Sequence, residues 1–503
     1  MDKSSKLWAV GIGVVLWLGG ARAQIDVDGL VGIGTGTIGV ETIFTKNIWG
    51  AATDEAQVMS DIKTLGDRRL YPVERFVLGQ VLTSDAGGQK NLEALGEEFL
   101  TARLDTLMKQ GLFEEVLAVA GRVPAELQSP TVKQRYATAL WGLGRVNEAC
   151  ADPLAAAFGP NEAFVRAACA AETEPEETAA LAFDVYRESG AERHTCFDAA
   201  GAVIYHQQTE LVKLGEECSL WEVLLAARAG KEQNLTRRGQ WRTLALNKKT
   251  AGAVRLYAAE KASLSAQDWL TVLDEVSDTS AQQVGPGKRA ALYHRAITAK
   301  TETDKQAVVA AYLESAVTDK VLFEVAPVAE VLLHGMKPFG GAEVAESAVL
   351  TFALAGEGEP MHTWLGRWCT QEPDRCLKAA VLRDVFGQAL PEDMTPLLSV
   401  CQREQSCATD LQALPFYLPF RKERVFDELA EVPAGYPPFV AYGLAEKIKT
   451  GAIAEGFLRT LVLLSQTKNT DRTLVENWGQ TLPEEIQRAV LVEQLVRRRG
   501  QIR

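Results

Sequence analysis

The chain has 503 residues, with 53 Lys and Arg against 66 Asp and Glu, which gives a formal net charge of −13. This acidic balance argues against nucleic acid and against an anionic membrane surface as main partners. Because one compact core rarely serves a chain of this length, we expect two domains or an array of repeats.

Residues 1–23 have the features of an export signal. Lys3 and Lys6 precede an apolar stretch, residues 7–19, that is short for a membrane-spanning helix, and Ala21-Arg22-Ala23 fits the pattern that signal peptidase reads. We therefore expect cleavage before Gln24 and a periplasmic mature chain, with an uncleaved N-terminal anchor as the alternative. The mature chain keeps 50 basic and 65 acidic residues, a charge of about −15, and contact with the membrane is expected only through partners.

Residues 24–52 are rich in glycine, which predicts an extended or flexible leader. Within them, residues 34–39 spell the G-x-G-x-x-G string of dinucleotide-binding folds. That chemistry requires a strand before the string and a helix after it, and the sequence provides neither. We therefore predict no nucleotide and no other cofactor.

From residue 53 onwards the sequence favours helices. Ala, Leu, Glu and Arg dominate segments of roughly 10 to 16 residues at helical spacing, whereas strand patterns are scarce. Breaks such as Gly340-Gly341 separate the segments, and Ser265 to Asp268 reads as a capping box that begins a helix. Helix, short turn and helix in succession predict an all-α fold, an α-solenoid of antiparallel helix pairs.

Two segments show the repeat directly. Residues 108–116 align with residues 141–149, so that Gly111 corresponds to Gly144 across 33 residues. Leu140, Gly144, Glu148 and Ala149 follow the Leu-x-x-Gly-x-x-x-Glu-Ala pattern of an inter-helix turn. In this region the chain resembles the tetratricopeptide repeat, whose period is 34. The resemblance covers about 70 residues and implies a superhelix with a concave groove that binds peptides or helices.

A boundary is expected between Gly230 and Lys249, where residues 231–239 are polar and poorly periodic. We therefore predict repeats resembling the tetratricopeptide family in residues 53–230 and an irregular array of helical hairpins in residues 249–503.

The eight cysteines form neighbouring pairs along the sequence. An even number after an export signal favours disulfides, although eight cysteines permit 105 connectivities. Sequential pairing has a physical rationale, because the first two separations match a helix plus a turn and the last two span a short loop. Buried free thiols are the alternative. The candidate pairs are Cys150 with Cys169, Cys196 with Cys218, Cys369 with Cys376, and Cys401 with Cys407.

Catalytic and metal-binding patterns are weak. Glu314-Ser315 and Glu346-Ser347 invite comparison with soluble lytic transglycosylases, which resemble this chain in helical content, but the surrounding catalytic motif of that family is missing. Histidine and cysteine spacings do not match a zinc site. We therefore predict a protein that is not an enzyme. A peptidoglycan-associated relative of those helical domains is the alternative function.

Aromatic residues near prolines are the candidate interaction sites, with helix-end packing as the alternative. They are Phe416, Tyr417, Phe420, Tyr436 and Phe439. Residues 56–82 are faintly similar to a periplasmic motility protein of rhizobia, a family thought to support the flagellar stator. This resemblance implies a scaffold or adaptor that binds protein partners in an envelope-associated assembly such as the flagellar motor.

Overall fold

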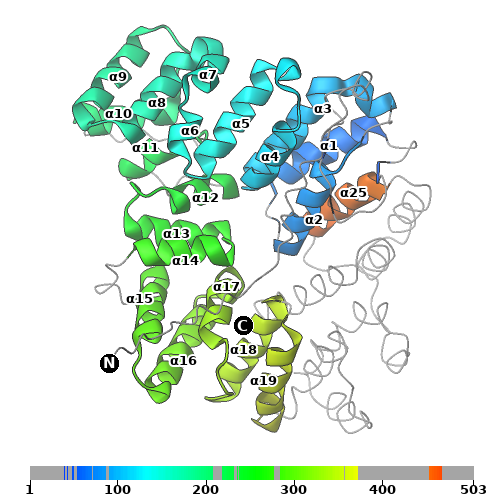
Figure 1. Cartoon of the computed structure of the whole chain (residues 1–503), viewed down its shortest axis with the longest axis vertical. Coiled ribbons are helices and arrows are strands. Elements are labelled where there is room, and N and C mark those ends of the chain that lie inside the picture. The colour runs from blue at the N-terminus through cyan, green and yellow to red at the C-terminus, as the bar shows by residue number, and fades with distance from the viewer. Residues whose placement is uncertain are drawn as a thin grey trace, which may run out of the picture. The chain divides into compact units, whose positions relative to one another are not determined.

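The computed structural model describes most of residues 54–371 and one later helix. The described ranges are 54–86 without 69 and 71, 90–207, 218–230, 237–276, 284–371 without 356, and 453–466, together with Gly39, Thr42, Ile48, Trp49 and Leu235. Every regular element formed by these residues is a helix, which confirms the all-α class (Figure 1). No described helix is both long and apolar enough to span a membrane.

Where the connecting residues are described, most helices follow one another with short turns between them. The first group is α1 (Glu55–Gly66), α2 (Pro72–Thr83), α3 (Lys90–Lys109), α4 (Phe113–Ala120), α5 (Pro130–Gly142), α6 (Val146–Ala149), α7 (Asp152–Ala155), α8 (Glu162–Thr173), α9 (Glu176–Glu188), α10 (Thr195–Tyr205) and α11 (Val223–Arg228), with the 3-10 helices η3 (Ala125–Leu127) and η4 (Ala156–Asn161). The second group is α12 (Arg238–Leu246), α13 (Gly252–Ala262), α14 (Ala266–Glu275), α15 (Gly285–Thr298), α16 (Glu302–Thr318), α17 (Leu322–Leu333), α18 (Ala342–Ala355), α19 (Gly358–Gln371) and α25 (Ile453–Gln466).

Side-chain caps fix several helix starts. The Ser265 hydroxyl accepts a hydrogen bond from the Asp268 backbone N–H at 3.2 Å, so α14 begins where the sequence predicted a cap. The Thr301 hydroxyl does the same for the Asp304 N–H at 3.1 Å and begins α16. Each cap satisfies one of the backbone donors that a helix N-terminus leaves unpaired.

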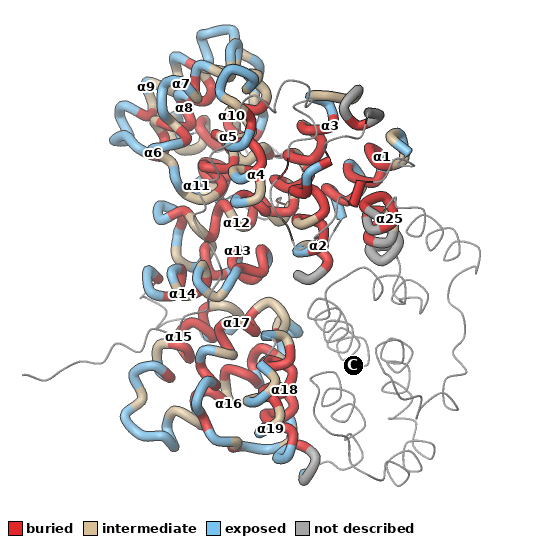
Figure 2. Tube along the Cα trace, turned by 45° about the vertical axis from the view of Figure 1, so that its right-hand side comes forward, coloured by how far each residue is buried: buried red, intermediate tan, exposed pale blue. Residues whose placement is uncertain are grey.

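Neighbouring helices pack against each other and bury their inner faces (Figure 2). The most extensive contacts join α18 to α19, α12 to α13, α15 to α16, α8 to α9, and α17 to α18. The buried apolar side chains form two clusters. The first core contains residues from 48–139 and 454–462, and the second core contains residues from 137–368. Helix α5 contributes to both cores, with Ala139 in the first and Trp141 in the second.

Helix α12 lies inside the stretch 231–248 that the sequence analysis placed between two helical regions. Its Trp241, Leu244 and Ala245 are buried, and the helix contacts α3, α5 and α13. The second core is therefore continuous across this stretch, because a short amphipathic helix fills it.

Helix α25 packs against α1 and α2, although nearly 400 residues separate them in sequence (Figure 1). The Ala454 N–H donates to the Ile48 carbonyl at 2.8 Å, and the Arg459 guanidinium lies 3.0 Å from the Asp61 carboxylate. Asp61 is almost fully buried, so α25 both covers the first core and supplies a cation to a buried acid.

The end of the predicted flexible leader is packed where the structure describes it. Trp49 is fully buried, its ring N–H donates to the Ser84 hydroxyl at 2.9 Å, and its ring meets Phe99 edge-on at 5.4 Å. At Ile48 and Trp49, near the end of the predicted leader, the apolar side chains complete the first core. The predicted signal, residues 1–23, lies outside the described residues.

Candidate ligand-binding site

The two predicted repeat turns have the same backbone geometry. Gly111 joins α3 to α4 with a φ of 73°, and Gly144 joins α5 to α6 with a φ of 71°. Glycine adopts this left-handed conformation at little cost, and it commonly ends helices. The hydrogen bonds also recur 33 residues apart. Gly111 N–H donates to the Met108 carbonyl and Gly144 N–H to the Trp141 carbonyl, each at 3.0 Å.

The other two turn residues have distinct roles. The Glu148 carboxylate accepts a hydrogen bond from Arg145 Nε at 2.7 Å, and this bond lowers the pKa of Glu148. Ala149 is fully buried in the second core. The exposed ion pair orients the turn, while the small alanine permits close helix packing.

A cavity of about 430 Å³ is lined in part by α3 and α5, the helices that precede these turns. Its walls come from α3, α5, the start of α12, the junction of η4 with α8, and the segments that precede α10 and α11. Met108, Phe158, Phe164, Leu220 and Trp221 supply apolar lining. A mostly apolar cavity of this size with a few polar groups is typical of a binding site for a small ligand or a short peptide segment.

One side of the cavity is basic. Arg135 Nε lies 2.6 Å from the Asp105 carboxylate, and Lys109 Nζ lies 3.0 Å from the Asp67 carboxylate. Arg237 Nε is 3.7 Å from the same Asp67. Three cations therefore face two carboxylates. Because these side chains are partly exposed, their ion pairs contribute little to stability and leave the cations accessible to a ligand.

Three other lining residues have buried polar atoms that receive no hydrogen bond from the described part of the chain. They are Asn161 Oδ1, His194 Nε2 and Ser219 Oγ. Leaving a buried polar group unpaired costs roughly 1–3 kcal/mol, so folded proteins seldom retain such groups without a reason. All three atoms belong to residues that line the same cavity, where water or a ligand can complete their hydrogen bonding.

The segment that carries Ser219 is held firmly. Trp221 Nε1 donates to the Thr138 hydroxyl at 2.9 Å, and Trp141 Nε1 donates to the Leu220 carbonyl at 2.8 Å. Both bonds fasten the segment to α5. The two indole rings also pack together, with centroids 4.4 Å apart.

Further hydrogen bonds fix the same segment on its other side. Gln240 of α12 donates to the Cys218 carbonyl at 2.5 Å. The buried Glu222 carboxylate accepts the Ser219 N–H at 2.7 Å and the Phe197 N–H at 3.3 Å. The Ser219 hydroxyl is thus unpaired among the described residues, while the Ser219 N–H and the carbonyls on either side of it have partners.

His194 is also held in place. Its ring stacks on Phe164 with centroids 3.6 Å apart and planes 12° apart. Its backbone N–H donates to the Tyr186 hydroxyl at 3.0 Å. Burial raises the pKa of Tyr186 to about 12, so this hydroxyl remains neutral at physiological pH.

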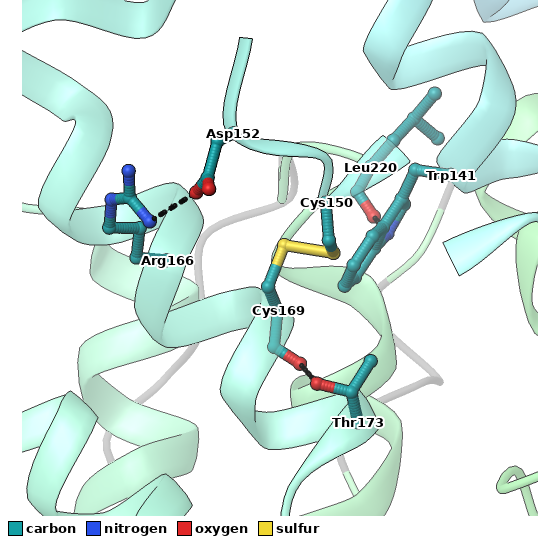
Figure 3. The surroundings of a disulfide bond; sticks show 7 residues. All are labelled: Trp141, Cys150, Asp152, Arg166, Cys169, Thr173 and Leu220. Atoms are coloured by element: carbon teal, nitrogen blue, oxygen red, sulfur yellow. Dashed lines mark hydrogen bonds and ion pairs between the residues drawn. A yellow bond between two sulfur atoms is a disulfide. The ribbon is translucent and has the colours of Figure 1, made fainter. Parts of the chain in front are cut away.

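Two disulfides are present, and both belong to the predicted sequential pairs. Cys150 at the end of α6 bonds to Cys169 in α8, and Cys196 in α10 bonds to Cys218. Figure 3 shows the first disulfide beside Trp141 and the Arg166–Asp152 ion pair. Such disulfides fit a compartment outside the reducing cytoplasm.

Several other predicted site residues cannot be placed. The side chains of Cys369, Cys376, Cys401 and Cys407 lie outside the described residues, as do Phe416, Tyr417, Phe420, Tyr436 and Phe439.

The two Glu-Ser dipeptides lie in α16 and α18. The Ser315 hydroxyl accepts a hydrogen bond from Arg289 at 3.2 Å, and the Ser347 hydroxyl donates to the Glu343 carbonyl at 2.7 Å. Both serines are buried and engaged in helix contacts. Among the described residues, no group of His, Cys, Asp and Glu is arranged to hold a metal ion.

Sequence reasoning did not single out Asn161, His194 or Ser219. The available signal was proximity to cysteines, since His194 lies two residues before Cys196 and Ser219 directly follows Cys218. Comparison of the chain with protein-family models, curated proteins and solved structures yields no match.

Proposed function

We propose that this protein is an exported, non-catalytic scaffold or adaptor that binds an extended segment of a partner protein. The cavity between α3, α5 and α8 is the observation that carries the proposal, because its lining combines aromatic rings with three unpaired polar atoms. A polypeptide segment matches this lining, since it offers apolar side chains and regularly spaced N–H and C=O groups.

The wider architecture in the proposal is an α-solenoid of antiparallel helix pairs that resembles tetratricopeptide repeats in its first half. The shared hydrogen bonds of the Gly111 and Gly144 turns support this assignment, as do the contacts between successive helices. In such arrays the stacked helix pairs form a concave binding surface. The helices that precede both turns, α3 and α5, are also the ones that line the cavity.

The proposed location is the periplasm, after removal of residues 1–23. The disulfides support an oxidising compartment, and the basic region, apolar stretch and Ala-x-Ala site support export. The similarity of residues 56–82 to a rhizobial motility protein makes an assembly around the flagellar stator the first partner to test.

A photocrosslinking amino acid at Lys109, on the rim of the cavity, tests the proposal in cells of the source organism. The matched control places the same amino acid at Lys63, an exposed lysine of α1 that does not line the cavity. We expect crosslinks at Lys109 to one partner protein, mapped by mass spectrometry to a single segment, and none of these at Lys63.

A second step confirms the contact with purified components. The mapped segment, made as a synthetic peptide, should bind the mature protein and compete with the crosslink. Motor proteins as crosslinked partners support the stator assembly. Crosslinks to glycan strands without any protein contradict the scaffold function and favour a peptidoglycan-associated protein, and equal crosslinking at both lysines contradicts a role for the cavity.

A further inference from the structure

The two ends of the Cys196–Cys218 disulfide lie beside two of the unpaired cavity residues. His194 is two residues before Cys196, and Ser219 directly follows Cys218, which itself lines the cavity. The disulfide therefore joins the wall that contains His194 to the wall that contains Ser219. It keeps the Cα atoms of the two cysteines 5.6 Å apart.

Each wall has its own attachments to the rest of the fold. The Ser219 wall is hydrogen-bonded to α5 and α12, whereas the His194 wall rests on Phe164 and Tyr186. The disulfide and the shared Glu222 carboxylate connect the two walls to each other, beside the packing of α10 against α11. The disulfide is the covalent part of that connection.

The unpaired atoms suit polypeptide main chain. The Asn161 carbonyl oxygen accepts a hydrogen bond, while the Ser219 hydroxyl either donates or accepts one. An extended peptide presents N–H donors and C=O acceptors in alternation. Walls that are already held at a fixed separation lose little conformational entropy when a peptide binds. Such preorganisation raises the affinity for the peptide.

We propose that the Cys196–Cys218 disulfide assembles this cavity into a binding site for main-chain amide groups of a partner peptide. The inference rests on the proposed function, because it names the chemistry of the same site and the device that positions it. Loss of the disulfide separates the two walls and weakens peptide binding, while the helices around the cavity keep their fold.

The second disulfide provides a matched control. Cys150–Cys169 spans 19 residues of sequence and Cys196–Cys218 spans 22, so the two constrain the unfolded chain to a similar extent. Cys150 and Cys169 join α6 to α8 and are not among the residues that line the cavity. A general loss of stability should thus affect both variants, whereas a loss of positioning should affect only one.

The experiment compares the mature wild-type protein with Cys196→Ala/Cys218→Ala and Cys150→Ala/Cys169→Ala. The probe is a randomised library of acetylated, amidated octapeptides without cysteine. Retained peptides are identified by mass spectrometry, and their Kd values are measured by fluorescence anisotropy. We expect the wild type and the Cys150/Cys169 variant to bind with similar Kd values. We expect binding by the Cys196/Cys218 variant to be about 10- to 100-fold weaker, as the loss of one or two hydrogen bonds predicts.

Amide hydrogen exchange of residues 218–222, measured without peptide, separates the inference from the proposed function. Faster exchange in the Cys196/Cys218 variant alone supports the positioning role, and unchanged exchange overturns it. If the wild-type protein retains no peptide, the peptide assignment and the proposed function both fail. The amide hydrogen exchange of residues 218–222 then still shows whether the disulfide positions the two walls. If the Cys196/Cys218 variant does not fold, Ser219→Ala provides the test, because it keeps the disulfide and removes only the hydroxyl. Peptide binding by Ser219→Ala that is as strong as in the wild type overturns the assignment of the cavity to main-chain amide groups.

Discussion

Replacement of Ser219 by alanine tests whether the cavity contains polar groups that the fold itself does not use. The substitution removes only the hydroxyl, which is buried and receives no hydrogen bond from the described residues. Because an unpaired buried hydroxyl costs roughly 1–3 kcal/mol, its removal should raise the free energy of unfolding by about 1 kcal/mol. Most substitutions destabilise a protein, so a stabilising one at a cavity wall is a distinctive result.

Urea unfolding followed by tryptophan fluorescence measures the effect, with Thr138→Val in α5 as the control. The Thr138 hydroxyl accepts the Trp221 ring N–H at 2.9 Å, and Trp221 is nearly buried. Its removal should lower the free energy of unfolding by about 1–3 kcal/mol, because it leaves that N–H without its acceptor. If Ser219→Ala destabilises the protein as much as Thr138→Val, the Ser219 hydroxyl has a partner and the reasoning about the cavity is refuted.

Three further predictions concern stability away from the cavity. Deletion of residues 453–503 removes α25, which covers α1 and α2. Limited proteolysis should then cleave α1 and α2 faster than in the full chain, while α15–α19 stay protected. Cleavage of α1 and α2 at the same rate in both proteins would contradict a covering role for α25. Arg289→Met removes the guanidinium that lies 2.6 Å from the buried Glu260 carboxylate. The free energy of unfolding in urea should fall by about 3–5 kcal/mol, because a buried charge loses its partner. An unchanged free energy of unfolding would show that the ion pair is dispensable. Burial raises the pKa of Glu172 above its usual 4.5, so the folded protein favours the protonated acid. The free energy of unfolding should therefore fall as the pH rises from about 4.5 through the folded-state pKa. Glu172→Gln should flatten that dependence between pH 4 and pH 8, and an unchanged slope would assign it to another group.

The local features of this fold were predictable from sequence. Helical spacing and capping residues such as Ser265 depend on neighbours within a few positions, and the structure confirms the helices and this cap. The glycines at 111 and 144 were identifiable because a left-handed turn leaves a residue preference that repeats with the period. The two described disulfides follow the sequential order because each closes a short stretch of helix and turn.

Features that depend on distant contacts were not predictable. The packing of α25 against α1 joins segments on opposite ends of the chain, and no local pattern in either segment records its partner. Trp49 was assigned to a flexible leader because its glycine-rich surroundings outweighed one aromatic residue, although Phe99 and Ser84 complete its environment. Helix α12 was missed because its apolar positions occupy barely two turns within a polar stretch.

The unpaired state of Ser219 is invisible in sequence for a deeper reason, since it is a property of what surrounds the residue. In this segment the Cys218 carbonyl, the Leu220 carbonyl and the Trp221 ring N–H each have a partner, and so does the Ser219 backbone N–H. Loose packing would leave several of these groups unpaired rather than one hydroxyl. Alanine at this position would give a more stable fold, because it has no hydroxyl to leave unpaired. The serine is therefore better explained by the proposed ligand, which would complete its hydrogen bond.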